Sequence, residues 1–251
     1  MTAKLKPLKW YQELADKKAR LSAGAFLMEG EKAIRQVLAN HPEAIIEIIS
    51  EGEPPLDFRK YPTREVSKSQ FDYISTTRTP QGLAAVLKMP ADIYSARLPA
   101  EAGGKILLLE DIQDPGNAGT LIRTAAAFDF SGVILSDKCA DPFSPKVVQS
   151  TAGAVMSVWL RAAAQYLELS NSLRARGYKL IAAELNGRDS PDVLHLNRFI
   201  LALGNEGAGL SPGLLKIADY RVGIPIAREK AESLNAAVCG AIMMYLSGGR
   251  R

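Results

Sequence analysis

The sequence predicts an α/β protein with a mostly parallel sheet. Short apolar runs alternate with segments of helical pattern, and the runs at 105–110 and 198–204 are apolar almost throughout, as in strands buried on both faces. Hydrophobic residues make up 47% of the 251 residues and charged residues 23%, the balance of a globular protein. The longest nearly apolar stretch, residues 234–246, is shorter than the roughly 20 residues that a membrane-spanning helix needs.

The N-terminal part is expected to form a small α/β unit. In chain order the predicted elements are a helix with apolar residues at Ala33, Ile34, Val37 and Leu38, a strand at 44–50, a loop at 52–62, a short helix at 67–75 capped by Ser67, and a strand at 82–90. Residues 91–104 then lose periodicity and gather Pro, Gly and Ala. We therefore expect two domains, residues 1–98 and residues 103–251.

The C-terminal part shows a regular alternation of strand and helix. The predicted strands lie at 105–110, 132–136, 178–185, 198–204 and 220–224, and the predicted helices at 117–128, around 145–150, near 166–176, after Ser211-Pro212 and at 233–247. This order implies a parallel sheet covered on both faces. Ligands collect at the carboxyl ends of such strands, so the loops after residues 110, 204 and 224 are the expected place for chemistry.

Charge and residue counts narrow the function classes. The formal net charge is +4, and the first 20 residues alone carry six basic and two acidic side chains. A basic N-terminal element suits a polyanion such as RNA, although so small an excess fits a solubility feature equally well. Cys139, Cys239, His41 and His195 offer too few ligands for a structural zinc site, so no metal is expected. The first ten residues lack the apolar region of a secretory signal, and we expect a cytoplasmic protein.

The first candidate loop leads from the strand at 105–110 into a helix. Asn117 can cap this helix, and Arg123 offers a planar fork that can bind phosphate through two hydrogen bonds. The alternative is an ordinary capped helix whose Arg pairs with a surface acid.

The second candidate loop is rich in glycine. Gly204, Gly207 and Gly209 show the reverse of the spacing of a dinucleotide-binding fingerprint, which disfavours a conventional Rossmann site. They allow a flat ligand to approach the backbone closely, with Glu206 among them. A glycine-rich turn without any ligand is the alternative.

The third candidate loop follows Pro225. Ser233 is predicted to be the N-cap of an apolar C-terminal helix, which on its own would be a plain core helix. The apolar pattern gives no reason for Asn235.

In this order the three loops resemble the motifs of the SpoU-type (TrmH-like) RNA 2′-O-ribose methyltransferases of the SPOUT superfamily. The similarity rests on Asn117, Gly119 and Arg123 in the first motif, Leu203–Gly207 in the second, and Ile224, Pro225 and Ser233–Asn235 in the third. The segments 26–38 and 79–86 are also similar to the ribosomal-protein-like RNA-binding domain that precedes many members. The resemblance implies a SpoU-type methyltransferase domain with a trefoil knot at 103–251, an RNA-binding domain at 1–98, and a homodimer that uses S-adenosylmethionine.

The resemblance also implies roles for individual residues. The expected catalytic residues are Arg123, Asn117, Glu206 and Asn235, and the expected cofactor-binding residues are Leu203, Gly204, Gly207, Ile224, Ser233, Leu234 and Asn235. Arg123 would clamp a phosphate and stabilise the developing alkoxide, since a guanidinium stays protonated and makes a poor base. Asn117 would orient Arg123 or the ribose, and Glu206 would support the site and could pair with Arg123.

Ribosomal RNA is the favoured substrate, and several alternatives stay open. They are a transfer RNA 2′-O-methyltransferase, a non-catalytic RNA-binding factor in ribosome assembly, and a knotted enzyme that methylates a base nitrogen. The last would not need the Asn117 and Arg123 pair.

Overall fold

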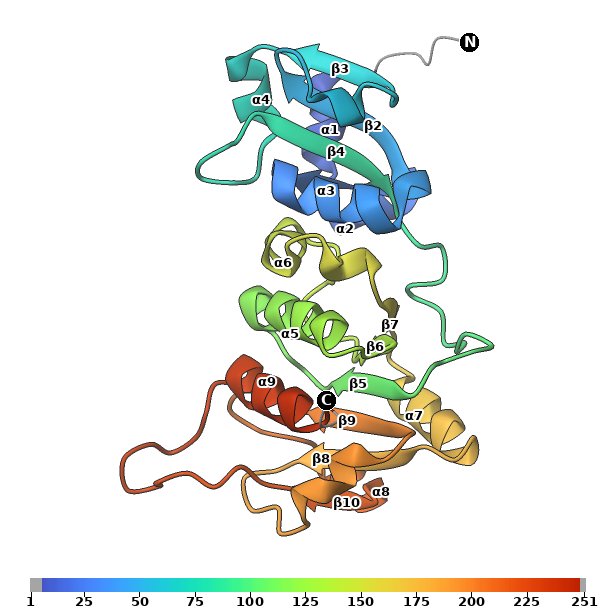
Figure 1. The fold of residues 1–251 in the computed structure, drawn as a ribbon, viewed down its shortest axis with the longest axis vertical. Coiled ribbons are helices and arrows are strands. Elements are labelled where there is room, and N and C mark those ends of the chain that lie inside the picture. Colours follow the sequence, from blue (N-terminus) through green and yellow to red (C-terminus); the bar gives the residue numbers. More distant parts are fainter. Residues whose placement is uncertain (1–5, 249–251) are drawn as a thin grey trace. The chain divides into compact units, whose positions relative to one another are not determined.

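The computed structural model describes residues 6–248 (Figure 1). Contacts between residues divide the chain into two compact units: the first runs to Ala91 and takes in Phe143–Ser157, and the second comprises Asp92–Pro142 and the chain from Val158 onward. The expected domains, 1–98 and 103–251, stay a prediction. In these contacts, residues 92–98 group with the second unit and residues 143–157 with the first. Lys4, part of the N-terminal basic excess, lies outside the described residues.

The first unit is built on a four-stranded sheet. Its strands β1 (Ala25–Glu29), β4 (Leu83–Lys88), β2 (Ile45–Glu51) and β3 (Thr63–Val66) follow one another in that order, with antiparallel pairs except for the parallel pair β2–β3. Its helices are α1 (Leu8–Glu13), α2 (Lys17–Ala23), α3 (Glu31–Asn40), α4 (Lys68–Ile74) and α6 (Pro145–Thr151), with short 3-10 turns at Pro42–Ala44, Leu56–Phe58 and Ala154–Met156. Tyr11, Phe71 and Ile74 join residues of the sheet in its core.

The helices and strands predicted for this unit are confirmed, whereas α1, α2, β1 and β3 were not predicted. Ser67 caps α4 in a reciprocal capping box with Gln70. Strand β3 falls just after the segment assigned to a loop, because only Val66 among its four residues is buried and the sequence shows no alternation there. Strand β1 overlaps the segment 26–38, for which the sequence analysis predicts no strand.

The second unit contains a parallel sheet, as the sequence predicts, but it has six strands where the sequence analysis expected five, and β7 is the strand that was missed. The strand order is β10 (Tyr220–Val222), β8 (Lys179–Ala183), β9 (Phe199–Leu203), β5 (Lys105–Leu109), β6 (Gly132–Leu135) and β7 (Trp159–Ala162), and every neighbouring pair is parallel. The helices are α5 (Pro115–Ala127), α7 (Tyr166–Ala175), α8 (Pro212–Ile217) and α9 (Ala236–Leu246), with a 3-10 turn at Pro191–His195. The trefoil knot stays a prediction.

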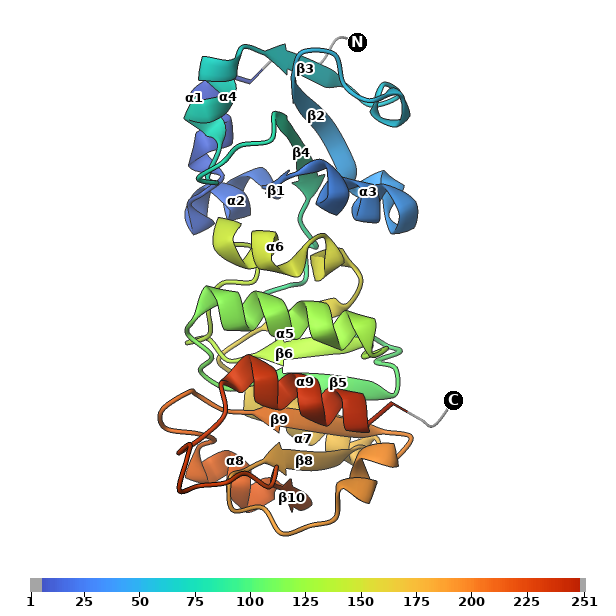
Figure 2. The same cartoon turned by 60° about the vertical axis from the view of Figure 1, so that its left-hand side comes forward.

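Alternate residues of β5 face two different helix pairs. Ile106 and Leu108 belong to a buried cluster that includes Leu173 of α7 and Leu214 of α8. On the other face, α9 packs against α5 and β9, and Figure 2 shows α9 in front of the sheet with α7 behind it. Both faces are therefore covered, which explains why these strands are apolar throughout. Within residues 6–248 no helix is long and apolar enough to cross a membrane.

The aperiodic segment before β5 is fixed to the second unit by side chains. The buried Arg161 of β7 pairs with Asp92 and donates to the carbonyl of Arg97, and Trp159 Nε1 donates to the Ala102 carbonyl at 3.0 Å. Loss of periodicity marked this segment as a boundary region, but these hydrogen bonds tie it to β7. The first segment of the first unit therefore ends at Ala91, and the chain enters the second unit at Asp92.

Gly132 offers a test of this packing. A Cβ at position 132 would lie 2.0 Å from the indole of Trp159, which pairs with Gly132 across β6 and β7. We expect Gly132→Val to lower the free energy of unfolding by about 1–3 kcal/mol, the usual cost of overpacking a core. Gly213→Ala is the matched control, since its Cβ would meet only Ser211 Oγ at 3.8 Å. Equal stability of the two variants in urea unfolding would contradict this packing.

Candidate functional site

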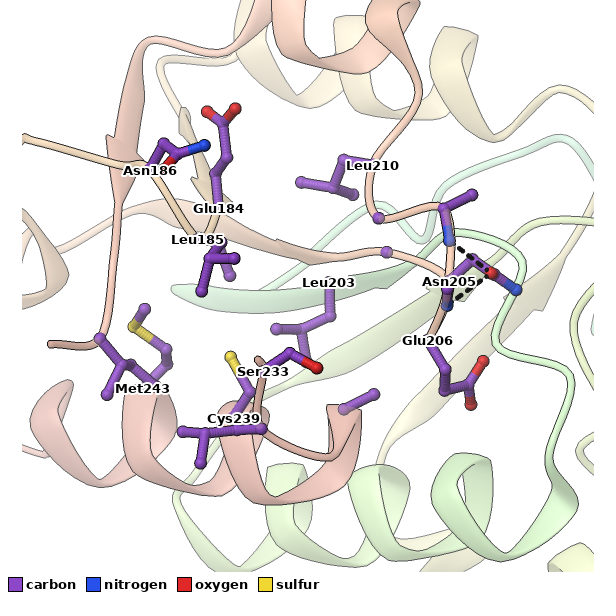
Figure 3. A pocket seen from close by; sticks show the side chains of 18 of the residues that line it. Glu184, Leu185, Asn186, Leu203, Asn205, Glu206, Leu210, Ser233, Cys239 and Met243 are labelled. Atoms are coloured by element: carbon purple, nitrogen blue, oxygen red, sulfur yellow. Dashed lines mark hydrogen bonds between the residues drawn. The ribbon is translucent and has the colours of Figure 1, made fainter. Parts of the chain in front are cut away.

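A cavity of about 510 Å³ lies at the carboxyl ends of three parallel strands (Figure 3). It is bounded by the loops that follow β8, β9 and β10 and by one side of α9. Six of the seven predicted cofactor-binding residues line it: Leu203, Gly204, Gly207, Ile224, Ser233 and Leu234. The loops after residues 204 and 224 thus meet at the carboxyl ends of the parallel strands, as the sequence analysis expects.

The glycine-rich loop after β9 folds back on itself. The backbones of Asn205 and Gly209 exchange two hydrogen bonds of 3.0 and 2.9 Å, and Asn205 Oδ1 accepts from the backbone N–H groups of Gly207 and Ala208 (Figure 3). A Cβ on Gly204 would lie 2.3 Å from the backbone of Gly209, so the loop itself requires glycine at 204. A Cβ on Gly207 would meet only Asn205 Oδ1, at 3.6 Å. Gly207 is therefore free to serve a ligand.

One hydrogen-bond chain joins residues of all three motifs. Asn235 Nδ2 donates to Asn117 Oδ1 at 3.1 Å, and Asn117 Nδ2 donates to Glu206 Oε1 at 2.9 Å. Residues 117 and 206 are 89 positions apart in sequence, and residues 117 and 235 are 118 apart. Because both polar groups of the Asn117 amide are used, its orientation is fixed. Three of the four predicted catalytic residues thus lie together beside the cavity.

The caps of the two helices differ from the predictions. Asp114, not Asn117, is the N-cap of α5, and its Oδ1 accepts from the Asn117 backbone N–H at 2.8 Å. Asn235, not Ser233, caps α9 by accepting from the backbone N–H groups of Ala237 and Val238. The helix begins later than predicted, and Glu232, Ser233 and Leu234 before it line the cavity. The cap explains why a polar residue precedes this apolar helix.

Arg123 is not joined to the other catalytic candidates. It lies six residues after Asn117 on α5, which corresponds to about 9 Å of rise and about 240° of rotation. Its side chain is exposed, and within residues 6–248 it makes no hydrogen bond or ion pair. The suggested pairing of Glu206 with Arg123 is absent, because Glu206 bonds to Asn117 instead.

The loop after β8 contributes residues that sequence reasoning missed. Glu184, Leu185 and Asn186 line the cavity, and Arg228 Nη2 donates to the Leu185 carbonyl and to Asn186 Oδ1, both at 2.8 Å. β8 is adjacent to β9 in the sheet, so the rule that ligands bind at the carboxyl ends of strands would have found this loop once the strand order was known.

The cavity wall combines apolar and polar residues and carries negative charge. Glu184, Glu206 and Glu232 line it, and none of the Lys, Arg or His residues in the described part of the chain does. Arg221 approaches Glu184 from outside at 3.8 Å. Cys239 and Met243 form part of the apolar wall, and burial raises the pKa of the Cys239 thiol, which keeps it neutral. Such a cavity suits a ligand with a flat apolar portion and a positive charge.

The described residues contain no group of three His, Cys, Asp or Glu side chains that could hold a metal ion. Both cysteines are free thiols. Cys139 is partly buried and donates to the Leu109 carbonyl at 3.2 Å. Cys239 instead lies on the cavity wall.

Both parts of the chain match known protein families. Residues 104–245 match the model of the SpoU rRNA Methylase family, and residues 6–85 match the MRM3-like substrate binding domain. The chain is 35% identical over 251 residues to the 23S rRNA (guanosine(2553)-2'-O)-methyltransferase RlmP of Bacillus subtilis, an alignment that covers 97% of this chain and 96% of the relative.

Two solved structures superpose on nearly the full length. One is a putative RNA methyltransferase of the TrmH family from Porphyromonas gingivalis, with a TM-score of 0.81 and 32% identity over 99% of this chain and 100% of that one. The other is the SpoU methyltransferase AviRb from Streptomyces viridochromogenes in complex with AdoMet, with a TM-score of 0.81 and 25% identity over 97% of each chain. The motif loops, the sheet around which they meet and the matched sequence agree: this chain belongs to the SpoU rRNA methylase family.

Proposed function

We propose that this protein transfers the methyl group of S-adenosylmethionine to a ribose 2′-hydroxyl of ribosomal RNA. The observation that carries the proposal is the Asn235–Asn117–Glu206 hydrogen-bond chain beside a cavity that fits the cofactor. The B. subtilis relative is named for 2'-O-methylation of 23S rRNA, and the S. viridochromogenes structure contains AdoMet. Both support the same assignment.

The cavity residues suit each part of S-adenosylmethionine. Leu185, Leu203, Leu210 and Ile224 offer apolar surface for the adenine ring, and the open side of Gly207 permits close approach to the loop backbone. Three glutamates without a lining cation favour a ligand that carries a sulfonium and an ammonium group. When bound, the cofactor supplies an activated methyl group on its sulfonium sulfur.

The chain's own residues then have to align the RNA hydroxyl. Asn235 fixes the Asn117 amide from one side and Glu206 from the other, so this set is preorganised to orient a ribose at the mouth of the cavity. Glu206 Oε2 makes no hydrogen bond within the described residues and can accept one from the substrate. Water or another group takes the hydroxyl proton.

Arg123 is proposed to bind a phosphate next to the reacting ribose and to stabilise the developing alkoxide. The exposed guanidinium has no partner among the described residues, and an Arg fork binds phosphate with two parallel hydrogen bonds. Its place on α5, apart from Asn117, means that the substrate or a second subunit must bring the reacting group to it.

A homodimer would supply that second subunit. Val238 and Tyr245 lie seven residues apart on one face of α9 and are 48% and 69% exposed, and Tyr245 contacts the ring of Phe128 at the end of α5. These residues form an apolar strip beside the helix that carries Arg123. We propose that a second copy of this chain covers the strip and that the two sites lie near this interface.

The first unit is proposed to bind the RNA, since residues 6–85 match a substrate-binding domain. We also propose that the protein acts in the cytoplasm, where ribosomal RNA is located, and that it needs no metal ion. The function is tested by incubating the full chain with S-adenosylmethionine, labelled in its methyl group, and separate ribosomal and transfer RNA fractions that lack the modification. Label in alkali-resistant dinucleotides of ribosomal RNA is the expected result.

The other products of that assay identify the alternatives. Alkali-resistant label only in transfer RNA would assign the transfer RNA activity. Label released in mononucleotides would indicate base methylation. Cofactor binding with no transfer to any RNA would favour a non-catalytic assembly factor.

Gly207→Val should abolish cofactor binding without unfolding the protein. The valine side chain would enter the open side of the loop, where the cofactor approaches the backbone, and its Cβ meets no backbone atom. We expect the dissociation constant measured by calorimetry to rise at least about 100-fold, while the melting temperature stays near that of the parent. Gly204→Ala is the contrasting variant and should lower the melting temperature, because its Cβ collides with the loop backbone. Unchanged affinity in Gly207→Val would place the cofactor elsewhere.

Arg123→Ala should slow methyl transfer and leave cofactor affinity nearly intact. Loss of one donor to a developing oxyanion costs about 10²–10³ in rate. Arg123→Lys should recover little, since an ammonium group cannot reproduce the planar fork. Arg198→Ala is the control, because this exposed Arg precedes β9 at the opposite edge of the sheet. A single-turnover rate for Arg123→Ala within a few-fold of the parent would make Arg123 an ordinary surface residue.

Tyr245→Glu should convert the dimer to a monomer. A carboxylate in the middle of a buried apolar strip would lose its water without a partner. Sedimentation velocity measures the change, and Leu56→Glu on the first unit, which also places a glutamate at an exposed large apolar residue, is the control that should remain dimeric. A parent chain that sediments as a monomer at assay concentrations would contradict the dimer.

A further inference from the structure

Glu110 is a buried carboxylate that neither the motifs nor the proposed mechanism uses. It follows directly after β5 and is 3% exposed. Its Oε1 accepts hydrogen bonds from Tyr166 Oη at 2.5 Å and from Ser211 Oγ at 2.7 Å, and its Oε2 accepts from the Ser211 backbone N–H at 2.6 Å. Within residues 6–248 no Lys or Arg forms an ion pair with it. A charge kept in such a place is costly unless its hydrogen bonds are good.

Two of these three hydrogen bonds hold the exit of the glycine-rich loop. Ser211 comes directly after Leu210, which lines the cavity. It is the N-cap of α8, and its Oγ accepts a hydrogen bond from the Leu214 N–H. Tyr166, in contrast, belongs to α7 and has no place on the cavity wall. Burial and the nearby Glu110 carboxylate raise the pKa of the Tyr166 phenol, so it stays a donor at physiological pH. The same carboxylate thus binds one partner at the loop and one away from it.

The entrance of the loop is held by the next residue of the chain. Asn205 Nδ2 donates to the Asp111 carbonyl at 2.9 Å, and Asp111 has a positive φ of 58°. That conformation is held by Ser136, whose Oγ accepts from the Asp111 N–H at 2.9 Å and donates to Asp111 Oδ1 at 2.6 Å. Residues 110 and 111 therefore hold both ends of the segment 205–211 at the end of β5.

We propose that Glu110 is a positioning residue for the cofactor: through Ser211 it fixes the glycine-rich loop in the conformation that S-adenosylmethionine binds. This inference rests on the proposed placement of the cofactor in this cavity. Glu110 touches neither substrate nor cofactor in it, because it is absent from the cavity wall. Its effect falls on cofactor affinity, and the rate at saturating cofactor is largely preserved.

Two single-hydroxyl deletions separate positioning from plain stability. Ser211→Ala and Tyr166→Phe each remove one hydroxyl donor to the same Oε1 atom, but only Ser211 belongs to the loop. In the full chain we expect Ser211→Ala to raise the dissociation constant of S-adenosylmethionine about tenfold and Tyr166→Phe to leave it within about twofold. Ser211→Thr keeps the hydroxyl and should restore the parent value. Glu110→Gln keeps the shape but loses the charge, and it should also weaken binding about tenfold.

Calorimetry of cofactor binding and melting temperatures are measured on the same samples, with the rate of methyl transfer at saturating cofactor. Equal losses of affinity in Ser211→Ala and Tyr166→Phe would overturn the inference, since Glu110 would then only stabilise the core. Unchanged affinity in both Glu110→Gln and Ser211→Ala would also overturn it. The proposed cofactor site fails separately: a parent chain that does not bind, or Gly207→Val with parent affinity, would reject the site itself.

Discussion

The close packing of α9 against α5 and β9 is the contact on which the site depends. A Cβ at Gly240 would lie 2.3 Å from a side-chain methyl of Leu121 in α5 and 2.6 Å from one of Leu203 in β9, so glycine lets α9 approach both without displacing these side chains. This approach brings the N-terminus of α9 beside that of α5, and Asn235 reaches Asn117. One small residue in an apolar helix thus allows three polar side chains from distant motifs to meet.

The glycine-rich loop illustrates a second constraint, which is that a ligand-binding loop has to be rigid without filling the space of its ligand. Its backbone closes on itself between Asn205 and Gly209, and the Asn205 side chain satisfies two further N–H groups. Asn205 donates to the Asp111 carbonyl and the Ser211 N–H donates to the Glu110 carboxylate, and these hydrogen bonds attach the loop to the end of β5. The hydrogen bonds that hold the loop therefore lie on the side away from the cavity, and no side chain fills the cavity side at Gly207.

Negative charge is distributed over the site in two different ways. Glu184, Glu206 and Glu232 line the cavity and can act directly on a cationic ligand. Glu110 is buried outside the cavity wall, and its carboxylate accepts hydrogen bonds from Tyr166 and Ser211. Arg123 on α5 carries positive charge that has no intramolecular partner in the described chain, which matches a role towards the phosphates of an RNA.

The sequence by itself determined the parallel arrangement of the sheet, two of the loops that bound the cavity, and six of its seven expected cofactor-binding residues. Apolar runs such as 105–110 and 198–204 predict strands in the interior of a sheet that is covered on both faces. Ligands bind at the carboxyl ends of such strands, so the strand ends also indicate which loops bind a ligand. The sequence did not determine which polar side chains would meet. Helix caps are decided by the one or two residues at which the chain enters the helix, so Asp114 and Asn235 displaced the predicted Asn117 and Ser233. The cavity residues Glu184 and Asn186, the carboxylate of Glu110 and the isolation of Arg123 depended on strand order and helix rotation, which bring together or separate residues that sequence distance cannot relate.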